Sequence, residues 1–450
     1  MVSSNVAIGL VAMALLFSGC QKGEKDQEQA VSESRILEIV QTLRSGDAGV
    51  RQRAVDRLKA AASDGLTIEE GTEAIRAAAE KWPAGEKIDA SDELVNAALS
   101  RQHTSYIKEV SEHFPRYSEM ARWRVVRYLI SVCNEAAARA YLDLIRQHQN
   151  LVPPASIQEF TQSAEATKLL LPDLLKYAGA DELGSQIQMF ALRAAQLGVV
   201  AETDLAPYAE PILRIYTPMR DRMRKIEKPA GDDWIWTDEY SDTRAHATLL
   251  LDLMGHLPGN VTKGPLEEAL SSRDPRVKLF AILSLLRHGY EVRPAVIEDV
   301  AASSEVRNWL YDGLVSLNRR KLYPPRFASQ DALAESNMVN WLTYPAELGR
   351  TPHEIKLMAT FDDDAGQQRH YLFRFRTHPP HWAAEDGWMA GLSGPFEIAT
   401  MPTTNAGGST FSKFTKWDNK TPKEHFEAIS GLIAKHWKKR AAEITNEAGE

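Results

Sequence analysis

Apolar residues recur at helical spacing along most of the chain, from residue 35 to about 320. Positions i, i+4 and i+8 lie along one face of a helix. Six segments carry apolar or small residues at these positions, beginning at Val50, Ala121, Ile187, Thr243, Val277 and Val306. Ala281, between Val277 and Leu285, is small enough to let a neighbouring helix approach closely. Because one helix cannot bury such a stripe alone, the copies are expected to stack.

Helix-start signals precede the two best copies of this pattern. Asp47 and Asp274 are predicted N-caps, and Pro275 suits a first helical position. A shorter apolar helix is expected ahead of each copy, over 36–43 and over 266–270. The predicted unit is therefore a short helix, a turn containing Asp, and a second helix.

That unit, with the pattern Val-Arg-x-x-Ala-x-x-x-Leu, resembles the HEAT repeat, and its best copy is Ser272–His288. The resemblance implies a mainly α fold, a HEAT-like α-solenoid over residues 35–322, with degenerate copies between the clear ones. An irregular helical bundle is the alternative interpretation. An array of this kind offers an extended concave face to a partner.

The spacing changes from helical to alternating after Tyr323-Pro324-Pro325. Residues 370–376 alternate aromatic residues with Leu and Arg, which predicts a strand. Residues 355–361 are its expected hairpin partner, joined through Asp362–Gly366, and 388–392 are a third strand candidate. The run of Asp before Gly366 is interpreted as a hairpin turn rather than a calcium loop, because it lacks the alternating ligands of an EF-hand.

A helix is predicted from Thr421, where Thr421 and Glu424 form a capping box and Pro422 takes the first helical position. The apolar face expected on this helix consists of Phe426, Ile429, Ile433 and Trp437. Residues 335–440 are thus predicted to form a small α+β domain. Parts of it are similar to C-terminal modules of some uncharacterised bacterial helical-repeat proteins, a likeness that implies no activity.

The N-terminus combines an apolar run, Val6–Phe17, with Ser18-Gly19-Cys20 and a polar stretch over 21–34. A run of 12 residues is shorter than the ~20 that a membrane span needs. The arrangement resembles a bacterial lipoprotein signal. The resemblance implies removal of residues 1–19, a lipid on Cys20 that holds the protein to a membrane, a polar tether over 20–34, and a place in the cell envelope, on the periplasmic side or at the outer membrane. An uncleaved anchor or a frayed helix is the alternative.

Composition narrows the choice of partners and cofactors. A formal net charge of −8 and a pI near 5.9 argue against a nucleic-acid partner. The chain has two cysteines, so with Cys20 lipidated no disulfide or cysteine-based zinc site is expected, and Cys133 is predicted to be a small buried residue in a helix. No phosphate-binding loop or hydrolase motif occurs, and we expect no cofactor.

Two segments carry candidate site residues. His378 and His381 are candidate metal ligands, but solvated histidines are the simpler interpretation because no zinc-site spacing surrounds them. Residues 218–242 are interpreted as a long loop, basic in its first half and acidic and aromatic in its second. Its aromatic residues would be costly to expose, so they are expected to pack in a groove of the array, on a partner, on a sugar ring or back on their own repeat; they are Trp234, Trp236 and Tyr240.

Three functions are compatible with these patterns. The first is a non-enzymatic envelope lipoprotein that binds a protein or glycan through its helical-repeat surface. The second is an enzyme or metal-dependent module with its site in the C-terminal domain, around Arg374, Arg376, His378, His381 and Glu385. The third is a purely structural envelope linker. No catalytic residue can be assigned from the sequence.

Overall fold

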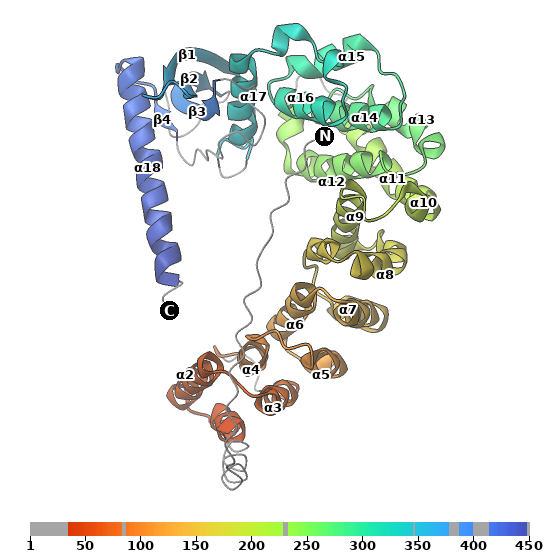
Figure 1. The fold of residues 1–450 in the computed structure, drawn as a ribbon, viewed down its shortest axis with the longest axis vertical. Coiled ribbons are helices and arrows are strands. Elements are labelled where there is room, and N and C mark those ends of the chain that lie inside the picture. The colour runs from red at the N-terminus through yellow and green to blue at the C-terminus, as the bar shows by residue number, and fades with distance from the viewer. Residues whose placement is uncertain are drawn as a thin grey trace, which may run out of the picture. The chain divides into compact units, whose positions relative to one another are not determined.

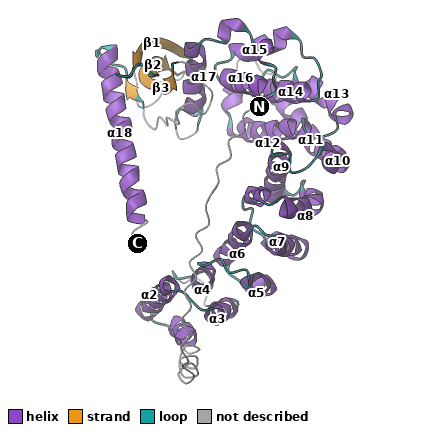
Figure 2. Ribbon diagram, in the orientation of Figure 1, coloured by secondary structure: helices purple, strands orange, loops and turns teal. Residues whose placement is uncertain are grey.

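The computed structural model describes residues 35–82, 87–227, 233–344, 347–377, 387–398 and 414–447 of the 450-residue chain. Its contacts divide the chain into two compact units, Met1–Ala155 and Ser156–Glu450. The fold is mainly helical, with one small antiparallel sheet in the C-terminal part (Figure 2). Cys20, His378, His381 and Glu385 lie outside the described residues.

The first unit is built of helices that pack in alternation (Figure 1). After a helix over 35–43, they are α2 (Ala48–Asp64), α3 (Ile68–Ala78), α4 (Ala90–Leu99), α5 (Tyr106–His113), α6 (Glu119–Val132) and α7 (Glu135–His148). Helix α4 contacts both α2 and α6, and α5 contacts both α3 and α7. The predicted stripe is confirmed in α2 and α6, where Ala54, Leu58, Ala121, Val125 and Leu129 are fully buried.

The second unit continues with helices and ends with the sheet. Its helices before the sheet are α8 (Ala164–Leu174), α9 (Asp181–Gln196), α10 (Glu202–Leu205), α11 (Ala209–Ile226), α12 (Asp238–Met254), α13 (Gly259–Ala269), α14 (Pro275–Arg287), α15 (Pro294–Ala302), α16 (Arg307–Ser316) and α17 (Gln330–Leu342). Helix α14 lies at the centre of this group, because it contacts α12, α13, α15 and α16.

The predicted helix starts are confirmed where the caps were expected. Asp47 accepts a hydrogen bond from the backbone N–H of Val50, and Asp274 accepts one from that of Arg276, with Pro275 in the first turn. The helix expected over 266–270 is longer, because α13 already begins at Gly259.

Two expectations about local structure are wrong. Residues 218–242 are not a long loop: α11 continues to Ile226 and α12 begins at Asp238. Cys133 is not a buried core residue of a helix. It is partly exposed and caps the end of α6 in a left-handed conformation, at a φ of 50°.

The sheet has the order β1-β2-β3-β4 and is antiparallel throughout. Its strands are β1 (Glu354–Asp362), β2 (Gln368–Arg376), β3 (Met389–Glu397) and β4 (Thr415–Lys416). The predicted hairpin is confirmed, and Gly366 supplies its turn with a positive φ of 63°. The third strand runs further than the expected 388–392.

One helix covers each face of the sheet (Figure 1). Tyr371, Phe373 and Phe375 of β2 share a core with Met338 of α17. On the opposite face, Leu372 shares a core with residues of α18 (Pro422–Glu447), the predicted C-terminal helix. The alternation along β2 was therefore predicted correctly. Helix α17 was not anticipated.

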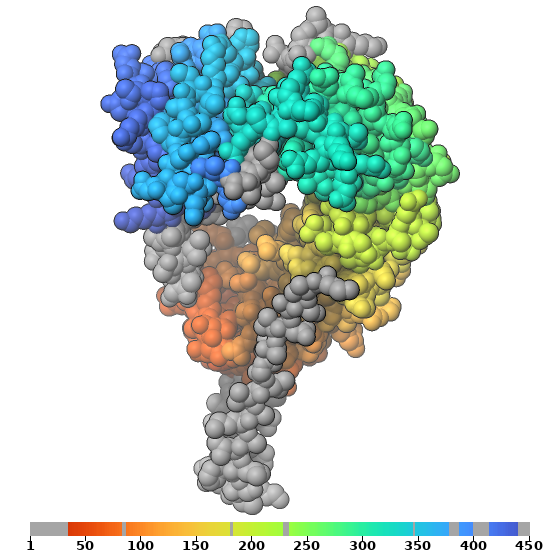
Figure 3. Space-filling view, turned by 45° about the horizontal axis from the view of Figure 1, so that its top comes forward, coloured from red at the N-terminus to blue at the C-terminus, as the bar shows by residue number. Residues whose placement is uncertain are grey.

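The surface of the C-terminal part adjoins that of the preceding helices of the same unit, as the blue and cyan-green regions of Figure 3 show. Helix α17 provides the connection, because it contacts α16 on one side and both β2 and β3 on the other. Whether residues 335–440 fold independently stays a prediction. Among the residues that the structure describes, no helix combines the length and apolar character that crossing a bilayer requires.

Candidate ligand cavity

Several helices of the repeated pattern carry an arginine directly after the first position of the stripe. Three of these arginines donate hydrogen bonds to backbone carbonyl oxygens shortly before their own helix: Arg51 to Ser45, Arg122 to Tyr117, and Arg307 to Ala301 and Ala302. Carbonyl groups between helices have no partner within a helix, so an arginine here meets a general need of the fold.

Arg244, the corresponding residue of α12, has different partners. Its Nη1 lies 3.5 Å from Asp274 Oδ2 and 3.5 Å from Glu305 Oε1. Its side chain is 5% exposed, and those of the two carboxylates are 0% and 4% exposed. The arginine thus meets acidic groups from the start of α14 and from the segment before α16, which joins α12 to the starts of those two helices.

Arg276 in the first turn of α14 completes a cluster of four charged groups. Its Nε lies 2.6 Å from Glu305 Oε1, and its Nη2 donates to Thr343 Oγ1 at 3.0 Å. Asn340 donates to the backbone oxygen of Glu305 at 3.3 Å. Burial raises the pKa of Glu305 and lowers the pKa of Arg276, since desolvation of each charge outweighs the attraction of its partners.

Each arginine of the cluster lies over a tryptophan. The guanidinium carbon of Arg244 is 5.4 Å from the ring centroid of Trp236, which ends the short 3-10 helix η6 (Asp233–Trp236). That of Arg276 is 5.3 Å from the ring centroid of Trp309 in α16. Cation–π contacts of this kind hold both the guanidinium groups and the rings in place.

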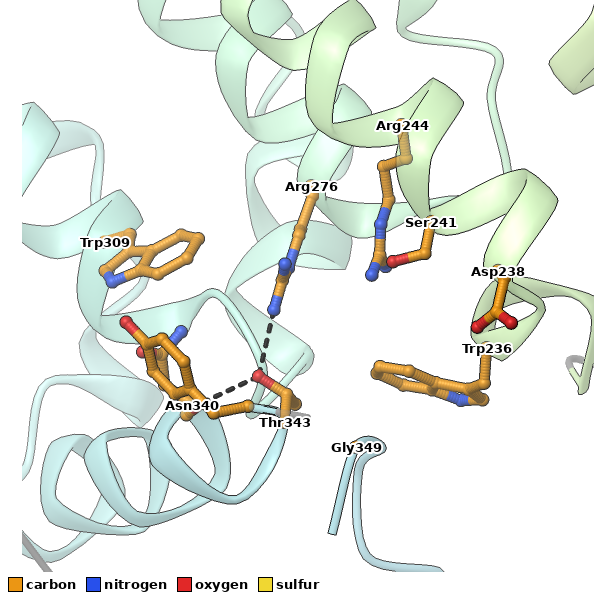
Figure 4. Close-up of a pocket in the computed structure, with 10 residues that line it drawn as sticks. Trp236, Asp238, Ser241, Arg244, Arg276, Trp309, Asn340, Thr343 and Gly349 are labelled. Atoms are coloured by element: carbon orange, nitrogen blue, oxygen red, sulfur yellow. Dashed lines mark hydrogen bonds between the residues drawn. The ribbon is translucent and has the colours of Figure 1, made fainter. Parts of the chain in front are cut away.

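These residues enclose a cavity of about 430 Å³, which is within the size range of small-molecule sites (Figure 4). Its lining consists of Trp236, Asp238, Ser241, Arg244, Arg276, Trp309, Asn340, Thr343, Tyr344 and Gly349. In Figure 4 the two guanidinium groups lie between the two tryptophans. The lining comes from α12, α14, α16 and α17 and from the segments beside them, so the C-terminal part supplies one wall.

The three aromatic residues predicted as a partner-binding loop lie in different places. Trp236 lines the cavity. Trp234 is 7% exposed, and its ring meets that of Tyr240 edge-on at 4.7 Å. Tyr240 is fully buried in α12 and donates to Glu227 at 3.1 Å, and burial together with nearby carboxylates raises its pKa. Two of the three thus pack on their own repeat.

The residues proposed for an enzymatic site lie only partly within the described chain. Arg374 and Arg376 of β2 lie over the ring of Trp388, with guanidinium carbons 3.8 and 4.7 Å from its centroid. The candidate metal ligands His378 and His381 fall outside the described residues. Within the described part of the chain, no group of three or more His, Cys, Asp or Glu side chains could hold a metal ion.

A second, smaller cavity of about 200 Å³ lies at the other end of α12. His256, just after that helix, lines it together with Glu202, Arg287 and His288. Burial, with added repulsion from Arg287 and His288, lowers the pKa of His256 to about 4.

Comparison of the chain with models of known protein families, with curated proteins and with solved structures gives no match. The candidate site therefore stands on its own geometry.

Sequence reasoning identified Trp236 but missed the other residues of the larger cavity. One signal was present: a basic residue follows the first stripe position at Arg51, Arg122, Arg244, Lys278 and Arg307. This pattern marks basic residues that reach into the junctions between helices. It does not distinguish Arg244 from the arginines that bind carbonyl groups. Asn340 and Thr343 gave no signal, because the helix that positions them was not expected.

Proposed function

We propose that this protein is a membrane-anchored envelope lipoprotein that acts as a non-enzymatic binding protein. A lipid on Cys20 anchors it, a HEAT-like helical array forms most of its body, and the cavity between Trp236 and Trp309 takes the ligand or the protruding group of a partner. The cavity is the observation that carries this proposal. The signal-like N-terminus supports the location, and the alternating packing of α2 to α7 supports the array.

The chemistry of the cavity favours binding over catalysis. Its lining is made of aromatic rings and hydrogen-bonding groups on helices, which fix a ligand in one orientation. The two groups with shifted pKa values at this site, Glu305 and Arg276, are engaged with each other rather than directed at a reacting atom. A nucleophile with an adjacent base, the usual arrangement for covalent catalysis, is not found among the cavity residues named above.

Binding is tested by a thermal-shift screen of the full-length chain, in detergent, against amino acids, peptides, nucleosides, organic acids and sugars. A ligand of the cavity should raise the melting temperature of the wild type and have no effect on the Trp236→Ala, Trp309→Ala double variant. Trp82→Ala is the matched control, because Trp82 is also half-buried and lies under an arginine, Arg44, but belongs to the first unit. A screen in which no compound stabilises the wild type, or in which the double variant responds equally, contradicts the binding function.

The location is tested separately by fractionating cells that express Cys20→Ser. The variant should lose both lipid attachment and its place in the membrane fraction. A variant that is still processed and sediments with membranes would show that Cys20 is not the anchor.

A further inference from the structure

We propose that the ligand of the larger cavity is an uncharged saccharide, recognised by two tryptophan faces and by the guanidinium groups of Arg244 and Arg276. The inference rests on the proposed binding function and adds the class of ligand. It depends on four properties of the cavity: its charge balance, its hydrogen-bonding capacity, its aromatic walls and its rigidity.

The charges of the site balance within the protein. Arg244 and Arg276 are opposed by Asp274 and Glu305, which lie 3.5 Å or less from them. The further carboxylate of the lining belongs to Asp238, which is exposed at the start of α12. The cluster therefore presents no excess of positive charge to attract an anion. A ligand with several charges would have to be desolvated without a counter-charge to meet it.

The same arginines keep hydrogen-bonding capacity. A guanidinium group has five N–H donors. Arg244 donates only through Nη1 to the residues that the structure describes. Arg276 donates through Nη2 to Thr343, and its buried Nε forms an ion pair with Glu305, which leaves Nη1. Planar donors held in a fixed orientation suit adjacent hydroxyl groups, each of which offers two acceptor lone pairs.

Acceptors and small polar groups surround these donors. Asp238 contributes a carboxylate that can accept from a hydroxyl, and Ser241 stands one helical turn further along α12. Asn340 uses its amide nitrogen towards Glu305, so its amide oxygen remains an acceptor. Because a sugar hydroxyl both donates and accepts, a lining with donors and acceptors side by side matches it better than it matches a carboxylate, which only accepts.

The aromatic walls complete the match. Trp236 and Trp309 are partly exposed and lie on opposite sides of the guanidinium groups in Figure 4. Tyr344, at the mouth, is 59% exposed. An aromatic ring offers apolar area at little cost in conformational entropy, and the C–H faces of a sugar ring are apolar while its edge is polar. A flat ring with polar edges can thus lie with its apolar face against the exposed part of a tryptophan and with its hydroxyl groups towards the arginines.

The walls are held in advance of binding. Arg244 is 5% exposed and tied to two carboxylates, and Arg276 is tied to Glu305 and Thr343. Groups already fixed in place lose little freedom when a ligand arrives. The site therefore needs no rearrangement of α12, α14 or α17.

The test applies the full-length chain, in detergent, to an array of immobilised neutral and acidic glycans and then titrates free glycan by tryptophan fluorescence. Neutral glycans should bind. Trp309→Ala and Arg276→Lys should each weaken the affinity about tenfold, and Asp238→Asn about threefold. Asp238→Asn keeps the test valid if a more buried variant fails to fold, because the residue is exposed.

Two matched control variants change the same residue types, a tryptophan and an arginine, at positions outside the larger cavity. Trp82→Ala removes a half-buried tryptophan of the first unit, and Arg287→Lys alters another arginine of α14 that pairs with a carboxylate, Asp252. Neither should change glycan affinity. Binding confined to acidic glycans, an array without any neutral glycan bound, or an equal loss in the controls overturns the proposal. If a compound other than a sugar binds and depends on Trp236 and Trp309, the saccharide class is wrong while the binding function stands.

Discussion

Helices α12 and α16 carry an arginine at the same position of the repeated sequence pattern and use it differently. Arg307, at the start of α16, is buried and donates to the backbone oxygens of Ala301, Ala302 and Ala332. Its Nη1 also donates to Glu335 Oε1 at 3.3 Å. Arg244 in α12 is equally buried but meets Asp274 and Glu305. At Arg307, three backbone oxygens and one carboxylate engage all three guanidinium nitrogens. At Arg244, side chains hold the guanidinium group from one direction, and a cavity opens on the other.

A repeated sequence pattern can thus acquire a candidate site at one of its copies. An arginine that satisfies carbonyl groups between helices is needed wherever that junction occurs. Where the partners engage the arginine through one nitrogen only, as at Arg244, its remaining donors stay available. The local sequence pattern is the same in both cases, so the difference comes from the residues that neighbouring helices bring to it.

The largest loss of stability is expected from Ala281→Glu, which should disrupt the packing of both α12 and α16. Ala281 is fully buried in α14, the helix that contacts both α12 and α16. A carboxylate there has no partner and no room, and it should cost at least about 4 kcal/mol of the free energy of unfolding. Hydrogen exchange should rise in the second unit and remain unchanged over residues 35–155, since the two units are compact by themselves.

Ala245→Glu is the control, because Ala245 is exposed on α12. It should change the free energy of unfolding by less than about 0.5 kcal/mol. If the Ala281→Glu protein melts like the wild type, the assignment of this stripe to the core is wrong.

Replacing Arg307 and Arg244 one at a time should distinguish a role in stability from a role in ligand binding. Arg307→Met leaves the carbonyl groups of Ala301 and Ala302 without this donor, removes the ion pair with Glu335 and should cost about 3 kcal/mol. Arg244→Met should cost about 2 kcal/mol, because Asp274 still caps α14 and Glu305 still has Arg276. Urea denaturation measures both values. Only Arg244→Met should abolish binding at the cavity, so equal loss of binding in both variants would remove the distinction between the two regions.

A histidine at the opposite end of α12, His256, should make the stability of the protein depend on pH. His256 has a pKa of about 4 in the folded protein against 6.5 ordinarily, so the unfolded chain takes up its proton first as the pH falls. Stability should therefore be fully present above pH 7 and decrease towards pH 4, by about 1–2 kcal/mol after allowance for partial exposure.

Denaturation at several pH values with His256→Gln should show a flatter profile between pH 7 and 4. The charged groups that face this histidine in its cavity are Glu202, Arg287 and His288, so the same variant tests whether His256 or its neighbours titrate. His103→Gln, at an exposed position of the first unit, should keep the wild-type slope. An unchanged slope in His256→Gln would assign the pH dependence elsewhere.

The smallest loss of stability is expected at the hydrogen bond between Arg276 of α14 and Thr343, just after α17. Thr343→Val removes the acceptor of the bond from Arg276 and should cost about 1 kcal/mol. Thr217→Val is the control, because that exposed hydroxyl bonds only to Leu213 in its own helix, and a change below about 0.5 kcal/mol is expected. Differential scanning calorimetry resolves the two. Similar values would show that the bond to Arg276 contributes nothing.

The sequence was sufficient wherever neighbours along the chain decide the structure. Helical stripes, the caps at Asp47 and Asp274, the hairpin and the start of α18 at Thr421 all depend on local spacing and on hydrogen bonds within a few residues. Residues 218–226 were misjudged because their many charges hid the amphipathic character of α11.

The site could be predicted only in part, because it depends on contacts between distant segments. Arg244 and Glu305 are 61 residues apart, and Arg276 and Thr343 are 67 apart. No periodicity brings such pairs together. Trp236 was found because a large aromatic residue among polar ones must pack on something. Trp309 gives no separate signal, because it lies within a helix that already carries a regular apolar stripe.

Helix α17 has one further consequence. Its Met338 belongs to the core of the sheet, while Asn340 and Thr343 hold the wall of the cavity. Occupancy of the cavity is therefore linked by mass action to the folding of the sheet: a ligand at one hundred times its dissociation constant adds about 2.7 kcal/mol to both together. A chain cut before Ser329 would lose the cavity along with the sheet, so a truncated form of the protein would keep the helices up to α16 and no longer respond to a ligand of the cavity.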